Sequence, residues 1–383
     1  MLVVTANWGI TDGTLVRPAA GWQPRLITAV RRAVGRAGFR QDGSYRPVDL
    51  VDLVVAGDAF DWLVSAEWCG RHRPWHGGAA TEEIVRRIAL RSIRSGRRLL
   101  GQLARWGRRG LEVPAPDHRG RPALTTARVA VRVTVLAGDR DERLSGMARP
   151  ARLPIAVGEA WDHDHVTIRH GHDRDPACHR PESVTCRRPA ERPPTLAESV
   201  AVDLVAPFAV AVHDAIGPVA TRLVRSLAAA RAVEIPAVLT AWRRGLHGAD
   251  IADAGPRLDA VWRRCVDRWA MQARRSVPSC EAEFDAVDAL AGWLAFAAAG
   301  EGPGGGPPGL ERLAVRCPPT PRTVATHAWR PADGQGPPVV AVSPDAEGIR
   351  LTALVGREPR EPVITVGATG CGRVDGNAIV DAA

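Results

Sequence analysis

Several apolar segments of this chain end in the same way, and this repeated ending limits the folds available to it. Residues 48–58, VDLVDLVVAGD, and residues 127–139, ARVAVRVTVLAGD, are both rich in valine and both finish in Gly-Asp. A third segment, HVTIRH at 165–170, leads directly into a glycine. Before them come a short apolar segment at 2–4 and apolar residues with helical spacing at 26–34. The alternation predicts an α/β layered sheet whose functional site lies where the strands end.

A long amphipathic helix is predicted from residue 81 to about Trp106. Thr81 can act as its N-cap, and Glu82 and Glu83 suit the positive end of the helix dipole. We therefore expect a single helix over this range.

The chain as a whole divides into three parts around two linkers. Residues 181–195 are rich in proline and arginine, and residues 300–309, GEGPGGGPPG, are rich in glycine. Residues 196–299 have helical periodicity throughout, and one predicted helix face carries only apolar residues and a cysteine: Leu258, Val261, Trp262, Cys265 and Trp269. We expect a first part at 1–180, a helical insertion at 196–299, and a C-terminal part at 310–383 that returns to strand patterns.

The strand ends carry an ordered series of short motifs. GDAFD at 57–61 matches a GDxxD motif, and AGDRDERL at 137–144 matches GN[HR]D with Asp139 in place of asparagine. RHGHD at 169–173 matches a histidine-glycine motif, and TVATHAWRP at 323–331 is similar to a closing GHxHxP motif. In order and spacing, this series resembles the calcineurin-like metallophosphoesterase family, and most of all its bacterial members that cleave UDP-diacylglucosamine.

The resemblance covers about residues 1–180 and 310–370, and it implies a four-layer αββα sandwich with two metal ions. The first metal site of the family needs a DxH pair, and alignment on TDGT places Asn7 and Gly9 at those two positions. It also needs the second closing histidine, where this chain has Trp329. Of that site only the bridging aspartate, Asp58, is retained, so the first metal is not expected to bind.

The second metal site of the family is retained in this mapping. The resemblance assigns to it Asp58, Asp139, His170 and His327, a reasonable set for one Zn²⁺, Mn²⁺ or Fe²⁺. Arg140 stands where the family has an arginine, and a guanidinium suits a phosphate oxygen. Asp58 and Arg140 are thus the candidate catalytic residues. Because one metal activates water and neutralises phosphate less than two, we expect weak or altered hydrolysis of a phosphate-containing small molecule or lipid-linked substrate.

Simpler roles exist for the same residues. Asp58 and Asp139 would also suit turns that cap the next segment, and His170 and His327 would also suit bonds to the backbone. Five further polar residues near 170 match no ligand of the family and are expected to form a solvated rim: His163, His165, His172, Asp173 and Asp175. Of these, His172 and Asp175 could instead touch the substrate. The competing hypothesis is a catalytically inactive relative that serves as a binding or structural module.

Composition sets limits on partners. The net charge of +9 comes entirely from arginine, and the arginines are scattered along the chain. A basic protein attracts polyanions, but no nucleic-acid motif accompanies this charge, so nucleic-acid binding ranks last among the three functions.

Targeting signals are not evident in the sequence. The N-terminus MLVVTANWGITDG does not have the pattern of a signal peptide. The apolar stretch VAVDLVAPFAVAV at 200–212 is interrupted by Asp203 and Pro207 and is short for a transmembrane span. Seven cysteines without a C-x-x-C pair favour a reducing cytoplasm.

Overall fold

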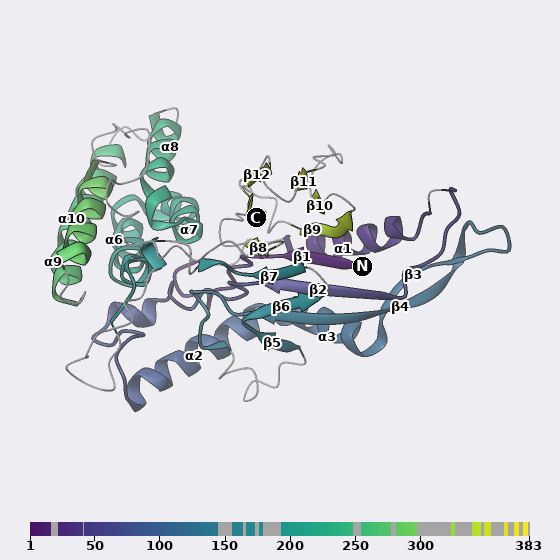
Figure 1. The fold of residues 1–383 in the computed structure, drawn as a ribbon. Coiled ribbons are helices and arrows are strands. Elements are labelled where there is room, and N and C mark those ends of the chain that lie inside the picture. The colour runs from purple at the N-terminus through teal and green to yellow at the C-terminus, as the bar shows by residue number, and fades with distance from the viewer. Residues whose placement is uncertain are drawn as a thin grey trace.

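The protein is a mixed α/β structure with a helical block beside its main sheet (Figure 1). The computed structural model describes residues 1–16, 22–40, 42–144, 155–163, 166–172, 176–178, 193–247, 254–276, 281–296, 323–325, 339–345, 348–353, 364–366, 371–374 and 378–381. The parallel strands predicted from the sequence are present, so the α/β class is confirmed.

The main sheet has its parallel strands at the centre. Strands β1 (Leu2–Thr5), β2 (Leu50–Ala56) and β4 (Pro122–Leu136) lie side by side and parallel, and β5 (Ala156–Gly158) pairs with β4 in the same sense. On the other side of β1, strands β9 (Val339–Asp345), β10 (Gly348–Ala353) and β11 (Ile364–Val366) continue the sheet with antiparallel pairing. Because β1, β2 and β4 are parallel, the loops that follow them leave the same edge of the sheet.

Two smaller sheets complete the described strands. Strand β7 (Val166–Arg169) pairs antiparallel with β6 (Ala160–His163) and parallel with β8 (Thr323–Ala325). Strands β12 (Cys371–Val374) and β13 (Ala378–Asp381) form a separate pair. The pairing of β7 with β8 joins the first and the C-terminal parts of the chain.

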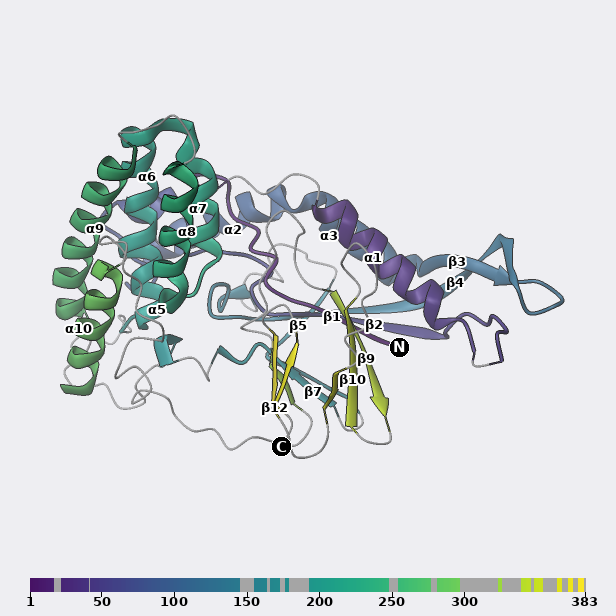
Figure 2. The same ribbon diagram turned by 90° about the horizontal axis from the view of Figure 1, so that it is seen from above.

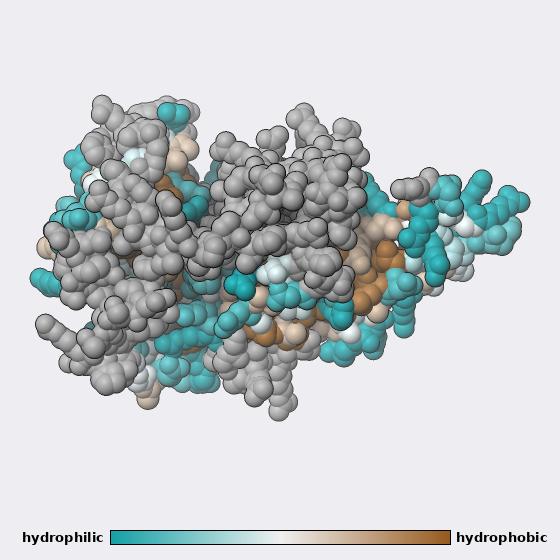
Figure 3. Space-filling view, viewed as in Figure 1, coloured by the Kyte–Doolittle hydropathy of each residue, from teal (hydrophilic) through white to brown (hydrophobic). Residues whose placement is uncertain are grey.

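A long hairpin extends away from the rest of the sheet. Strand β3 (Leu111–Pro116) pairs antiparallel with β4, and the far end of this hairpin presents a hydrophilic surface on the face drawn in Figure 3. Arg128 and Glu112 form an ion pair across it at 3.5 Å, and both side chains are more than half exposed.

The predicted helix from 81 to 106 is two helices. Helix α1 (Trp22–Ala37) precedes β2, and α2 (Ala79–Ser95) and α3 (Arg97–Arg109) follow it, separated by Gly96. A Cβ at Gly96 would lie 2.9 Å from Cδ1 of Ile10, so the close packing of that side chain favours glycine at the break. The prediction that Thr81 is the N-cap was wrong, because α2 already begins at Ala79 and Thr81 lies buried within it.

The prediction that residues 196–299 are helical is confirmed for the described part of that range. The helical block contains α5 (Leu196–Ser199), a π-helical turn at Val200–Val205, α6 (Ala206–Ile216), α7 (Ala220–Ala229), α8 (Ile235–His247), α9 (Ala254–Ser276) and α10 (Glu281–Phe296), with short 3₁₀ turns between them. On α9 the predicted apolar face is buried, and the ring of Trp262 packs edge-on against Phe208 of α6 with centroids 5.0 Å apart. The indole N–H of Trp269 donates to the Ser199 hydroxyl at 2.8 Å, which ties α9 to the end of α5.

The first helices of this block run on without a long break. Within the described residues, Leu196–Ala229 is the one helical run long and apolar enough to cross a membrane, at 34 residues. The run is long enough for a transmembrane span, so the expectation that residues 200–212 are too short for one no longer applies. However, 56% of its most apolar window is buried inside the protein, as in the core helix of a helical block, so the run is weak evidence for a membrane span.

Candidate metal centre at the strand ends

The loops after β1 and β2 run side by side in an unusual backbone conformation. Asn7 and Asp58 both have positive φ, at 53° and 45°. Left-handed backbone costs an L-residue on the order of 1 kcal/mol, although Asn and Asp tolerate it best. Cross-loop hydrogen bonds hold it in place, from the Asn7 N–H to the Gly57 carbonyl at 3.1 Å and from the Gly9 N–H to the Asp58 carbonyl at 3.0 Å. Asn7 and Gly9, which stand at the positions of the DxH pair in the resemblance, thus lie directly beside Asp58.

The glycine of each Gly-Asp pair leaves space for a neighbouring polar side chain. A Cβ at Gly57 would lie 2.1 Å from Cδ2 of His170, and a Cβ at Gly138 would lie 2.1 Å from Oδ1 of Asp58. Gly57 also has a φ of +83°. Both glycines are therefore required for His170 and Asp58 to sit against the backbone of the adjacent strand ends.

His170 follows β7 and is the buried centre of the group. Its side chain is 2% exposed. On one side of the ring, Nε2 lies 3.3 Å from Oδ1 of Asn7 and 3.5 Å from Oδ2 of Asp58. On the other side, Nδ1 lies 3.1 Å from Nδ1 of His172 and 3.5 Å from Oδ1 of Asp139. The imidazole therefore has a different pair of polar neighbours at each nitrogen.

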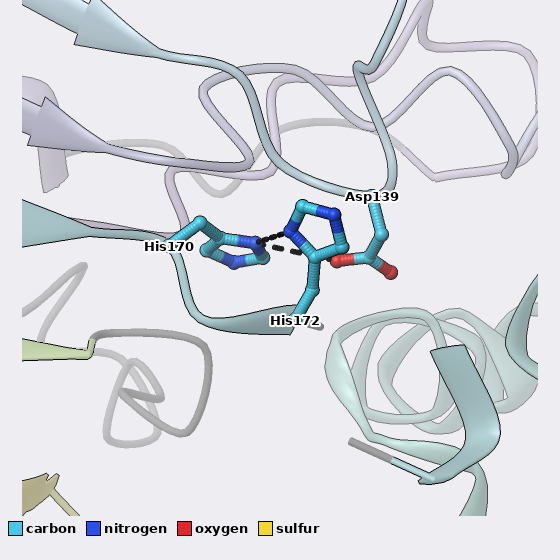
Figure 4. Close-up of side chains that lie close together, drawn as sticks. All are labelled: Asp139, His170 and His172. Carbon is cyan, nitrogen blue, oxygen red and sulfur yellow. Dashed lines mark hydrogen bonds and ion pairs between the residues drawn. The ribbon is translucent and has the colours of Figure 1, made fainter. Parts of the chain in front are cut away.

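Asp139, His170 and His172 form a compact group that faces one point (Figure 4). One ligand atom from each lies within 4.8 Å of the other two. The second oxygen of Asp139, Oδ2, accepts a long hydrogen bond from the Cys178 thiol at 3.7 Å. Nitrogen and carboxylate oxygen atoms at this spacing are suitable ligands for a divalent transition metal.

Carboxylates outnumber cations at this site. Burial raises the pKa of Asp58 well above its usual range, and the charges of Asp139 and Asp141 raise it further. Burial alone would also raise the pKa of Asp139, but His170 and Arg140 lower it below its usual value. The site thus has more carboxyl groups than its one guanidinium can neutralise, so Asp58 resists ionisation, and a bound cation would stabilise its ionised form.

Asp141 has a structural role that the sequence did not reveal. It is fully buried, its Oδ1 accepts the Gly138 N–H at 2.7 Å, and its Oδ2 accepts the Phe60 N–H at 3.0 Å. These bonds fix the turn after β4 against the turn after β2. Burial raises the pKa of Asp141 to about 7 despite the two hydrogen bonds.

Arg140 connects the site to the helical block. Its backbone N–H donates to Oδ1 of Asp58 at 3.1 Å, and its guanidinium donates to Oδ2 of Asp61 at 2.6 Å. The same guanidinium donates to the carbonyl of Ala228 and, at 3.0 Å, to that of Ala230, just beyond α7. Although burial would lower its pKa, the carboxylates of Asp61 and Asp58 raise it, so Arg140 is cationic. Three of the five N–H donors of a guanidinium are thereby committed.

A pocket opens beside the group. Its polar end is lined by Asp58, Asp139, Arg140, His172 and Cys178. Its remaining wall comes mainly from small and apolar residues of the helical block, among them Val200, Val205, Leu227 and Ile235. A ligand in this pocket would contact both the strand-end residues and the helical block.

The structure brings together most of the residues singled out in the sequence. Asp58, Asp139, Arg140 and His170 lie at one site, whereas His327 and Trp329 lie outside the described residues, as do His165, Asp173 and Asp175. His172 was expected in a solvated rim, but it lies against His170 at the mouth of the pocket. The signal for this was the His-Gly-His spacing, in which a glycine allows the chain to turn back after the strand.

Comparisons with protein-family models, with curated proteins and with solved structures find no match for this chain. The function of the site must therefore be inferred from its own chemistry.

Proposed function

We propose that the chain is a divergent metal-dependent phosphoric ester hydrolase that uses a single divalent transition metal, Zn²⁺, Mn²⁺ or Fe²⁺. The observation that carries this proposal is the excess of buried carboxylate around His170 at the mouth of a pocket. Buried charge of one sign is costly unless a partner neutralises it, and the oxygen and imidazole donors here suit a transition metal. Asp58, Asp139 and His170 are the described members of the set that the resemblance to metallophosphoesterases assigns, with His327 as the fourth.

The fold is compatible with this proposal. In it, the main sheet and the sheet of β6, β7 and β8 would be the two inner layers of a four-layer αββα sandwich, and the helical block would be the insertion that covers the site. Two strand ends of the main sheet provide Asp58 and Asp139, and β7 of the other sheet provides His170.

The residues divide the chemistry between them. A bound metal would lower the pKa of a water molecule and withdraw charge from a phosphate oxygen. Asp139 and His170 would hold it at the polar end of the pocket. Arg140 lines the same pocket and supplies positive charge to a bound phosphate, but its bonds to Asp61 and to two carbonyls make this role electrostatic rather than that of a bidentate clamp.

The substrate class is a phosphomonoester, a phosphodiester or a pyrophosphate in a small or lipid-linked molecule. The pocket supports a substrate with an apolar portion next to its phosphate, because apolar residues of the helical block, such as Val205 and Leu227, face the polar end.

A non-catalytic binding module is the second candidate. The loss of the first metal site favours it, because Asn7 offers only a neutral amide oxygen and Gly9 has no side chain at all. With one metal at most, the site lacks the second cation of a two-metal hydrolysis.

The test is metal analysis followed by a hydrolysis assay. Purified protein loaded with Zn²⁺, Mn²⁺ or Fe²⁺ should retain about one ion per chain and hydrolyse bis(p-nitrophenyl) phosphate, p-nitrophenyl phosphate or a nucleoside diphosphate ester. Asp139→Asn should abolish turnover, whereas Asp162→Asn, a change at an exposed aspartate of β6, should leave it intact. Metal binding without turnover of any of these substrates would favour the binding module instead.

A further inference from the structure

The orientation of the His170 ring separates the carboxylates that the resemblance treats as ligands of one ion. Asp58 faces Nε2, whereas Asp139 faces Nδ1 on the opposite side of the ring. An imidazole that binds a metal through one nitrogen carries its proton on the other and donates it to an acceptor. Nε2 faces two such acceptors, in Asn7 and Asp58, whereas Nδ1 faces His172 and Asp139, so Nδ1 is the nitrogen assigned to the metal.

The atoms on the Nδ1 side have the spacing of a metal site. For metal–ligand bonds of about 2.0–2.1 Å, two ligand atoms of a tetrahedral site lie roughly 3.3 Å apart. Nδ1 of His170 is 3.1 Å from Nδ1 of His172 and 3.5 Å from Oδ1 of Asp139. The Cys178 thiol bonds to Oδ2 of Asp139, which leaves Oδ1 as the oxygen directed at the histidines.

The open direction of this group leads into the pocket. Asp139 and His172 line the pocket, and His170 lies buried behind them. Three protein ligands and one position open to a cavity are the arrangement of catalytic rather than structural metal sites.

We propose that the ion is bound by Asp139, His170 through Nδ1 and His172 through Nδ1, and that Asp58 is a positioning residue whose carboxylate faces the Nε2–H of His170 and accepts a hydrogen bond from it. This inference rests on the proposed function in that a cation binds here at all. Among the described residues it differs from the resemblance in two places, because it adds His172 as a ligand and removes Asp58; His327 lies outside the described residues.

Two substitutions distinguish this ligand set from the one that the resemblance implies. His172→Ala should weaken Zn²⁺ and Co²⁺ binding by more than about 100-fold, because residues that only orient a ligand already account for roughly 10- to 100-fold. Asp58→Asn should weaken binding by no more than about 10-fold, because Asn7 still accepts the Nε2 proton. Asparagine also tolerates the positive φ at position 58 and keeps an acceptor for the Arg140 N–H, so this variant should fold.

The measurements are isothermal titration of the metal-free full-length protein with Zn²⁺ and the visible spectrum of its Co²⁺ form. The control His118→Ala removes an exposed histidine from the turn of the β3–β4 hairpin and should change neither. Thermal melting of metal-free His172→Ala, unchanged from wild type, would show that its lost affinity is not a folding defect. In Asp58→Asn the Co²⁺ spectrum should stay that of the wild type.

The outcomes separate this inference from the proposed function. Wild-type affinity and spectrum in His172→Ala, or loss of metal in Asp58→Asn that exceeds the loss in His172→Ala, would overturn the ligand set even if hydrolysis were observed. The predicted order of affinities without any hydrolysis would support the ligand set and refute the hydrolase. A wild-type protein that bound neither Zn²⁺ nor Co²⁺ would overturn both.

Discussion

Arg140→Gln is expected to destabilise the protein strongly, because one side chain joins the candidate metal site to the helical block. The guanidinium is 15% exposed and bonds to Asp61, which is 5% exposed, and to the carbonyl groups of Ala228 and Ala230. Glutamine is shorter and neutral, so it leaves a buried carboxylate without its counter-ion and two carbonyls without a charged donor.

The magnitude follows from the burial of the pair. Removing one partner of a buried ion pair costs roughly 3–5 kcal/mol, since the remaining charge is left unpaired. Asp61 retains the N–H groups of Leu63 and Val64 at 3.2 Å, which favours the lower end of that range, whereas the lost bonds to Ala228 and Ala230 favour the upper end. We expect a loss of about 4 kcal/mol.

The assay is urea unfolding followed by circular dichroism, with Arg128→Gln as the matched control. Arg128 also pairs with a carboxylate, that of Glu112, but at 3.5 Å on the exposed hairpin, where such pairs contribute about 0–1 kcal/mol. The reasoning would be refuted if Arg140→Gln lowered the free energy of unfolding no more than Arg128→Gln does.

Two further perturbations test the proposed metal site and the turns that hold it. Gly57→Ala should abolish metal binding although every ligand residue remains, because the added Cβ would overlap the ring of His170. The control Gly101→Ala changes an exposed position of α3 with open space around it, and thermal melting should show that it stabilises the protein by about 0.5–1 kcal/mol. In metal-free protein, the raised pKa of Asp141 means that its folded form holds a proton that the unfolded chain releases near pH 4; stability should therefore fall by roughly 4 kcal/mol as the pH rises from about 4 to 7. In Asp141→Asn this fall should be much smaller, and an equally steep dependence in the variant would assign it to other groups.

The meeting of Asp58 and Asp139 could be predicted because it depends on topology: both follow parallel strands, and the loops after parallel strands leave one edge of a sheet. His170 follows β7 of a second sheet, so this rule did not place it beside them. The division of the predicted helix into α2 and α3 could not be predicted in the same way. The break at Gly96 depends on the packing of Ile10, which is more than eighty residues away in the chain.

The detailed chemistry of the site also lay beyond the sequence. Which nitrogen of His170 faces Asp139 depends on one side-chain torsion, and the place of His172 depends on how the chain turns at Gly171. The contacts of Arg140 with Ala228 and Ala230 join segments about ninety residues apart and depend on where the helical block docks. Motif spacing contains no information about the ring orientation of His170 or the docking of Arg140, and for His172 the glycine of His-Gly-His was the one signal.

The close contacts at Gly57 and Gly138 have a genetic consequence. Every glycine codon is one base change from an alanine codon, and at either position the added methyl group would displace a side chain of the centre. The chain can therefore lose this centre by a point mutation that leaves each aspartate and histidine in place. An inventory of ligand residues alone would count such a descendant as intact.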